Sequence, residues 1–145
     1  MKPVRFTTAK YKQRGIAAVE FAMIAALLFT MLFGIMEMSR LLFAMNTAAE
    51  VTRLGARLAV VCDQGDSVIK SKMIDRLGYL TSGNINVAYS PNGCDASSCR
   101  SVTVSIAGLT VNTFTPLVPF TLNMPAFSTT LPRESMASLN NPVCI

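Results

Sequence analysis

Residues 16–36 read IAAVEFAMIAALLFTMLFGIM, an apolar run of 21 residues interrupted only by Glu20, Thr30 and Gly34. A helix needs about 20 such residues to cross the hydrocarbon core of a bilayer. We therefore predict that this stretch is a membrane-spanning helix. A cleaved secretory signal is the alternative, but its apolar region covers only about 7 to 15 residues and precedes a cleavage site of small residues. Here the run is longer, and charged residues follow it directly.

The net charge of the 145-residue chain is +5, and all of it comes from the segment before the apolar run. Eight basic and eight acidic residues follow Gly15, whereas five basic residues and no acidic residue precede it. These five are Lys2, Arg5, Lys10, Lys12 and Arg14. By the positive-inside rule this end stays in the cytoplasm, which predicts a single-pass membrane protein whose C-terminal part lies outside the cytoplasm. The residues that follow Gly15 carry balanced charge and are not expected to form a basic face, so we expect no nucleic-acid partner.

Helical periodicity continues beyond the apolar run. Apolar and small residues recur at steps of three and four, namely Leu41, Ala44, Ala48, Val51, Gly55, Leu58 and Cys62. Polar residues line the opposite side, namely Asn46, Glu50, Arg53 and Arg57. We therefore predict one helix from residue 16 to about residue 62, with a transmembrane part at 16–37 and an amphipathic periplasmic part at 38–62. Its small residues would let another backbone approach, either from the same chain or from a second protein.

Residues 63–145 are predicted to form a small periplasmic α/β domain. Asp66 or Ser67 can cap a short helix that continues through Leu77 and ends at Gly78. The period then changes to two, as expected for half-buried strands. Four extended segments are indicated, at residues 85–89, 102–106, 109–115 and 127–131, and Pro116, Pro119 and Pro125 mark a loop between the last two. The expected fold class is α+β, with the long helix packed on a small antiparallel β-sheet.

The four cysteines all fall on the side predicted to be periplasmic, where disulfides form. Three pairings are possible. Cys94 and Cys99 flank the tip of a predicted hairpin, which favours a local bridge and leaves Cys62 to join Cys144 in the C-terminal tail. The chain has no His and no Cys-x-x-Cys, so we expect neither a metal site nor a thiol oxidoreductase.

Motifs for catalysis are absent from the sequence. It has no Gly-rich phosphate loop, no Gly-x-Ser-x-Gly and no clustered carboxylates outside the predicted membrane span. Arg133, Glu134 and Ser135 form a short polar patch that is expected to be a solvated strand end. We therefore predict that the protein is not an enzyme, has no catalytic residues and needs no cofactor.

Glu20 is the one carboxylate inside the apolar run, about one helical turn from its start. An unpaired carboxylate near the middle of a bilayer costs roughly 2.5 to 3.5 kcal/mol, and less near the interface. One interpretation is that the hydrocarbon span begins at Phe21, which leaves a short span at residues 21–36 and places Glu20 among the lipid headgroups. The other interpretation is that a counter-charge compensates the carboxylate inside the membrane.

The surroundings of Glu20 resemble the type IV prepilin processing signature, in which basic residues precede a glycine and a glutamate is the fifth residue after it. The resemblance implies that a membrane peptidase cuts between Gly15 and Ile16 and removes the basic leader, residues 1–15, with Lys10, Lys12 and Arg14. It also implies that Glu20 pairs with the N-terminal ammonium group of a neighbouring subunit during assembly.

Residues 14–60 are similar to the TadE-like pseudopilins of tight adherence (Tad, or Flp) pilus systems. The motifs that carry this resemblance are Val19-Glu20-Phe21, Glu37 followed by Ser39-Arg40-Leu41-Leu42, and Ala48-Ala49-Glu50 leading to Gly55-Ala56-Arg57. The resemblance implies a pilin-like fold and the function of a minor pilin needed to assemble an adhesive pilus. Implied partners are the prepilin peptidase, other minor pilins, the pilus subunit, the inner-membrane assembly platform and the lipid bilayer. The alternatives are an uncleaved, membrane-anchored periplasmic binding or scaffold protein, and a type II secretion pseudopilin.

Overall fold

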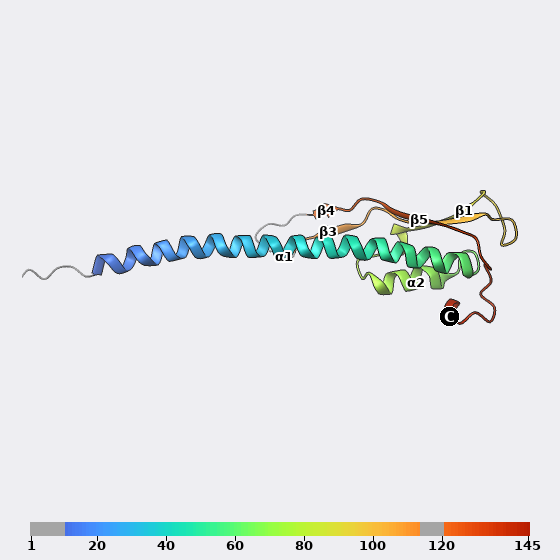
Figure 1. The fold of residues 1–145 in the computed structure, drawn as a ribbon, viewed down its shortest axis with the longest axis horizontal. Coiled ribbons are helices and arrows are strands. Elements are labelled where there is room, and N and C mark those ends of the chain that lie inside the picture. Colours follow the sequence, from blue (N-terminus) through green and yellow to red (C-terminus); the bar gives the residue numbers. More distant parts are fainter. Residues whose placement is uncertain (1–10, 114–120) are drawn as a thin grey trace, which may run out of the picture. The chain divides into compact units, whose positions relative to one another are not determined.

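The structure is a computed structural model that describes residues 11–113 and 121–145, with side chains from residue 15 onward (Figure 1). Of the leader charges, Lys10 lies outside the described residues, as do the side chains of Lys12 and Arg14. The chain divides into two compact units, Met1–Met38 and Ser39–Ile145. Helix α1, Tyr11–Val61, contributes to both units.

In the first unit, α1 presents apolar side chains to its surroundings. Ile16, Phe21, Leu27 and Phe29 are all more than half exposed. Within the part of the chain that the structure describes, α1 is the one helix long and apolar enough to span a membrane, and its most apolar window has no buried residue. This agrees with the predicted single-pass anchor.

The start of α1 differs from the prediction. We expected the helix to begin at Ile16, whereas it begins at Tyr11 and continues through Gly15. One glycine inside a helix costs only about 1 kcal/mol relative to alanine, so neighbouring residues with better helix propensity can extend the helix across it. The end of α1 at Val61 lies within one residue of the predicted end at about residue 62.

The second unit contains two antiparallel sheets. The larger one has the order β1-β2-β5, formed by β1 (Ile85–Ser90), β2 (Ser101–Ile106) and β5 (Phe127–Pro132). The smaller one pairs β3 (Thr110–Asn112) with β4 (Thr121–Asn123). The four predicted segments thus correspond to β1, β2, β3 and β5. We expected one sheet, but the backbone turns at Gly108, with φ 67, and directs β3 into a separate sheet. The end of the predicted segment 109–115 lies outside the described residues.

The core lies between these sheets, the outer half of α1 and helix α2, Ser67–Arg76. Val102, Val104 and Ile106 alternate with half-buried polar residues along β2, as the period of two predicted. The predicted apolar stripe of α1 is buried from Ala44 onward, but so are residues beyond the stripe, because α1 is covered on more than one side. The additional buried residues are Thr52, Ala56, Ala59 and Val60. The small residues of α1 therefore serve contacts within this chain.

The contact of Gly55 with Met73 shows why small residues are needed there. A Cβ built on Gly55 would lie 2.4 Å from Met73 Sδ, and the Met73 side chain is fully buried. We expect Gly55→Val to destabilise the second unit by about 2 kcal/mol, as overpacking of a filled core does. The measurement is the midpoint of thermal unfolding, followed by circular dichroism on the full chain in detergent.

Gly78→Val is the matched control, because a Cβ at Gly78 meets nothing within 4 Å. Adding Met73→Ala to Gly55→Val should recover part of the loss, since it opens space beside the new side chain. If both valine variants unfolded at the same temperature as the parent chain, the close contact with Met73 would not limit the residue at position 55.

Candidate functional site

Gly15, Ile16 and Glu20 lie on the exposed apolar part of α1 and share a shallow hollow with Val19 and Met23. The positions of Ile16 and Glu20 differ by four residues, so their side chains are neighbours on one face of the helix. Glu20 is exposed, and it makes no hydrogen bond or ion pair with another described residue. The carboxylate at Glu20 is therefore available to a charge that this part of the chain does not supply.

The surroundings of Gly15 give no reason within the fold for a glycine. A Cβ built there meets nothing within 4 Å, and its φ is not in the left-handed region that favours glycine. Alanine would suit a helix better by about 1 kcal/mol. Gly15 thus contrasts with Gly55, which is needed for packing, and with Gly108, which has a positive φ, but it shares its open surroundings with Gly34 and Gly78.

Arg40, on α1, donates from its guanidinium to the backbone oxygen of Asn112 at the end of β3. This bond joins two segments that lie 72 residues apart in sequence. Arg40 was noted in the sequence only as part of a family motif, and nothing in the local pattern indicated a partner. In the structure it holds the small sheet against the helix.

Both disulfides form in the pairing that the sequence favoured. Cys62 at the end of α1 joins Cys144 in the C-terminal 3-10 turn Pro142–Cys144, across 82 residues. Cys94 joins Cys99 across 5 residues in the loop between β1 and β2. Within the described part of the chain no group of three His, Cys, Asp or Glu residues lies close enough to hold a metal ion.

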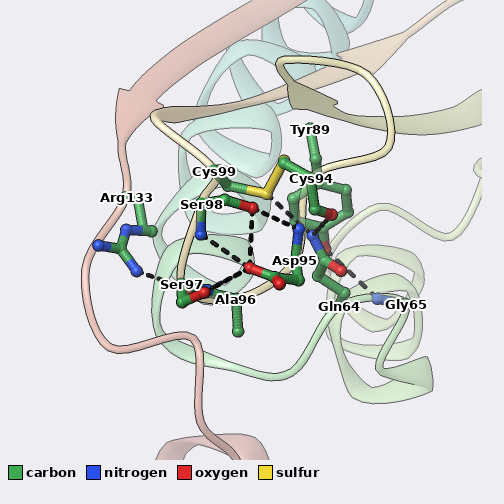
Figure 2. The surroundings of a disulfide bond; sticks show 10 residues. All are labelled: Gln64, Gly65, Tyr89, Cys94, Asp95, Ala96, Ser97, Ser98, Cys99 and Arg133. Carbon is green, nitrogen blue, oxygen red and sulfur yellow. Dashed lines mark hydrogen bonds between the residues drawn. A yellow bond between two sulfur atoms is a disulfide. The ribbon is translucent and has the colours of Figure 1, made fainter.

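The small disulfide loop is tied to its surroundings by hydrogen bonds (Figure 2). Gln64 Nε2 donates to the backbone oxygen of Cys94 at 3.0 Å, and Arg133 donates to the backbone oxygen of Ala96. Inside the loop, Asp95 accepts hydrogen bonds from the side chains and backbone N–H groups of Ser97 and Ser98, which lower the pKa of that carboxyl. These contacts order an exposed loop that has little apolar contact of its own.

A second polar cluster joins the start of α2 to the C-terminal tail. Asp66 caps α2 by accepting from Val68 N at 3.0 Å, and Ser138 Oγ donates to Asp66 Oδ2 at 2.7 Å. The hydrogen bond from Ser138, followed by that from Val68, lowers the pKa of Asp66 below its usual 3.8. Because the folded-state pKa is the lower one, this contribution to stability is present above about pH 4 and is lost as the pH falls through the folded-state value.

Tyr89 also faces this cluster. Its hydroxyl oxygen accepts from Gly65 N at 3.3 Å, and burial raises the pKa of the phenol. Sequence reasoning named Asp66 or Ser67 as the cap, and the structure selects Asp66. It missed Ser138 and Tyr89, because no local pattern places them beside Asp66. The cluster therefore fixes the C-terminal tail beside the start of α2.

Comparison with known families gives a match for residues 15–57, to the family described as TadE-like protein. Over this segment the chain is similar to TadE-like proteins. The TadE-like segment begins at Gly15, includes Glu20 and Arg40, and ends at Arg57. The match confirms the resemblance that the sequence showed over this segment. No curated protein and no solved structure matches the chain.

Proposed function

We propose that the protein is a minor pilin that a prepilin peptidase processes and that assembly of a Tad-type adhesive pilus requires. Two observations support the proposal, namely the TadE-like match of residues 15–57 and the glycine at its first position. The match carries more weight, because Gly34 and Gly78 also have nothing within 4 Å of an added Cβ; the glycine adds that the described residues give no reason for it at position 15. A requirement imposed by another protein, such as a narrow protease site, is a sufficient reason.

The proposed cut lies between Gly15 and Ile16. A protease needs an extended backbone, and glycine lowers the local cost of unwinding the helix and allows close approach. The cut removes a leader with Lys10, Lys12 and Arg14 and creates an ammonium group at Ile16. An α-amino group is mostly protonated at neutral pH. This ammonium supplies the counter-charge that Glu20 lacks among the described residues.

The proposed location is the bacterial inner membrane, with the N-terminus in the cytoplasm and the C-terminal unit in the periplasm. The proposed partners are the prepilin peptidase, other minor pilins, the pilus subunit, the assembly platform and the lipid bilayer. The role is structural, without catalysis and without a cofactor. The exposed apolar side chains of α1 suit both lipid and the helices of neighbouring subunits.

The test is the N-terminal sequence of the protein recovered from host membranes, in cells with and without the cognate peptidase. We expect the chain to begin at Ile16 only where the peptidase is present. A chain that begins at Met1 or Lys2 in both strains would contradict processing, and it would favour a permanently anchored protein whose Glu20 lies among the headgroups.

A further inference from the structure

A groove of about 610 Å³ runs along the outer half of α1, within the second unit. The residues of α1 that line it include Phe43, Thr47, Glu50, Leu54 and Arg57, which recur at steps of four and three. This spacing places them on one face of the helix. Arg76, the last residue of α2, forms part of the other wall. The groove therefore follows one face of α1, with the end of α2 beside it.

The apolar part of the groove is open to solvent. Phe43 is 70% exposed, and Leu54 is half-buried. Phe43 thus lies outside the core, whereas Ala44 and Ala48 on the neighbouring face of α1 are buried in it. Phe43 lies at the end of the groove where the lining of α1 begins, and an exposed aromatic side chain in a groove can anchor a partner.

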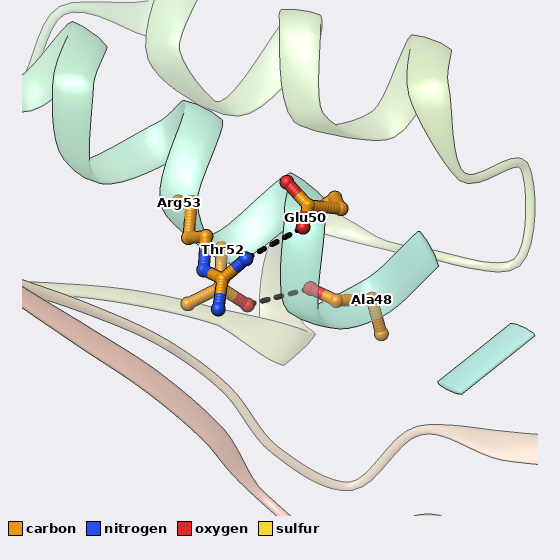
Figure 3. Close-up of polar contacts among 4 residues, drawn as sticks. All are labelled: Ala48, Glu50, Thr52 and Arg53. Carbon is orange, nitrogen blue, oxygen red and sulfur yellow. Dashed lines mark hydrogen bonds and ion pairs between the residues drawn. The ribbon is translucent and has the colours of Figure 1, made fainter. Parts of the chain in front are cut away.

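The charged part of the groove is positive. It is lined by three arginines and one glutamate, so its net charge is 3 − 1 = +2. Arg53 forms an ion pair with Glu50 at 2.6 Å (Figure 3). Arg57 and Arg76 make no hydrogen bond or ion pair with another described residue. Two arginines beside an apolar groove are thus available for carboxylates of a partner.

We propose that this groove docks a helix of another pilus-assembly protein, one that has apolar side chains along one face and carboxylates beside them. Helices bind grooves of this kind through anchors spaced like those of α1. Arg57 and Arg76 then select the partner by its acidic residues. The naming of the partner as an assembly protein rests on the function proposed above, whereas the helical and acidic chemistry rests on the groove alone.

A second copy of this chain fits the groove less well. Two copies that met groove to groove would bring the three arginines of each groove into one interface. Like charges in direct opposition across an interface are destabilising. Lipid headgroups also fit poorly, because Arg57 follows the apolar run by 21 residues, or about 30 Å of helix. The headgroup region extends only roughly 5 to 8 Å beyond the hydrocarbon.

The experiment places the photo-crosslinking residue p-benzoylphenylalanine at position 43 of the full chain, in host cells that assemble the pilus. The cross-linked peptide is identified by mass spectrometry. We expect a segment of a different protein with apolar residues at helical spacing and at least two acidic residues. The double variant Arg57→Glu/Arg76→Glu should reduce the yield about tenfold, because it opposes like charges. Lysines in place of the partner's carboxylates should restore it.

Lys70→Glu/Arg100→Glu is the matched control, because it reverses two charges outside the groove and should leave the yield unchanged. An adduct with lipid, with a second copy or with no partner at all would overturn the proposal, as would a yield that charge reversal does not change. The N-terminus of the protein is sequenced in the same cells. An acidic helical adduct on a chain that still begins at Met1 or Lys2 would sustain the docking groove while contradicting the proposed processing.

Discussion

Full-length protein with Cys62→Ala and Cys144→Ala is expected to lose about 4 kcal/mol of unfolding free energy in its second unit. This bridge closes a loop of 82 residues, and cross-linking a loop of that length removes about 4 to 5 kcal/mol of chain entropy from the unfolded state. Both cysteines are buried, and alanine avoids leaving an unpaired hydroxyl in the core. The midpoint of thermal unfolding should fall by roughly 15 to 30 °C.

The second disulfide is the internal comparison. Cys94→Ala/Cys99→Ala opens a loop of only 5 residues, for which the same relation gives about 2 kcal/mol. The expected order of stability is therefore parent, then the variant without Cys94 and Cys99, then the variant without Cys62 and Cys144. Each protein is unfolded in the same detergent and followed by circular dichroism. Equal losses for the two variants would mean that loop length does not set the contribution.

Hydrogen bonds also hold the C-terminal tail against the end of α1. Beyond the disulfide, the backbone N–H groups of Met136 and Ala137 donate to the carbonyl groups of Val60 and Val61 at the end of α1. Those bonds, and the hydrogen bond from Ser138 to Asp66, do not depend on Cys144, so the tail is expected to loosen mainly after residue 138. The disulfide thus acts largely on the unfolded chain, and the loss should exceed the change in native structure.

Local periodicity accounts for the parts of the fold that were predicted correctly. The step of three and four residues identified α1, and the step of two identified β1 and β2. Asp66 was one of two candidate caps, with Ser67, because a capping side chain acts on its own neighbours. The separation of the sheets was not predicted, because it depends on the positive φ of Gly108 and on which strands meet. The early start at Tyr11 was missed because Gly15 was taken as a boundary, although one glycine does not end a helix.

The candidate site was likewise predicted only where a local sequence motif determines it. Gly15 and Glu20 were identified because a motif places them at a fixed spacing, and the structure adds that the fold itself does not require the glycine. The groove was not predicted, since Arg53 and Arg57 belong to an ordinary polar helix face in the sequence. Only the packing of α2 brings Arg76 to the same groove. The groove depends on how α2 packs beside α1, and the periodicity of the sequence does not indicate that packing.

The variant Glu20→Ala is expected to be cleaved normally but to fail in pilus assembly, with piliation reduced at least tenfold. Under the proposed function, Glu20 pairs with the ammonium group at Ile16 of a neighbouring subunit in a medium of low dielectric constant. Removing one partner of a buried ion pair costs about 3 to 5 kcal/mol, because the other charge stays unpaired. N-terminal sequencing measures cleavage, and electron microscopy of the cells measures the number of pili.

Two further variants separate the charge of Glu20 from its shape and from processing. Glu20→Gln keeps the size and the hydrogen-bonding capacity but removes the charge, so it should fail like Glu20→Ala if the ion pair is what assembly needs. Gly15→Ala should fail at the earlier step and retain the leader, although alanine fits the helix at this position. Normal piliation with Glu20→Ala would contradict the pairing, and it would leave Glu20 as a headgroup residue of a correctly processed subunit.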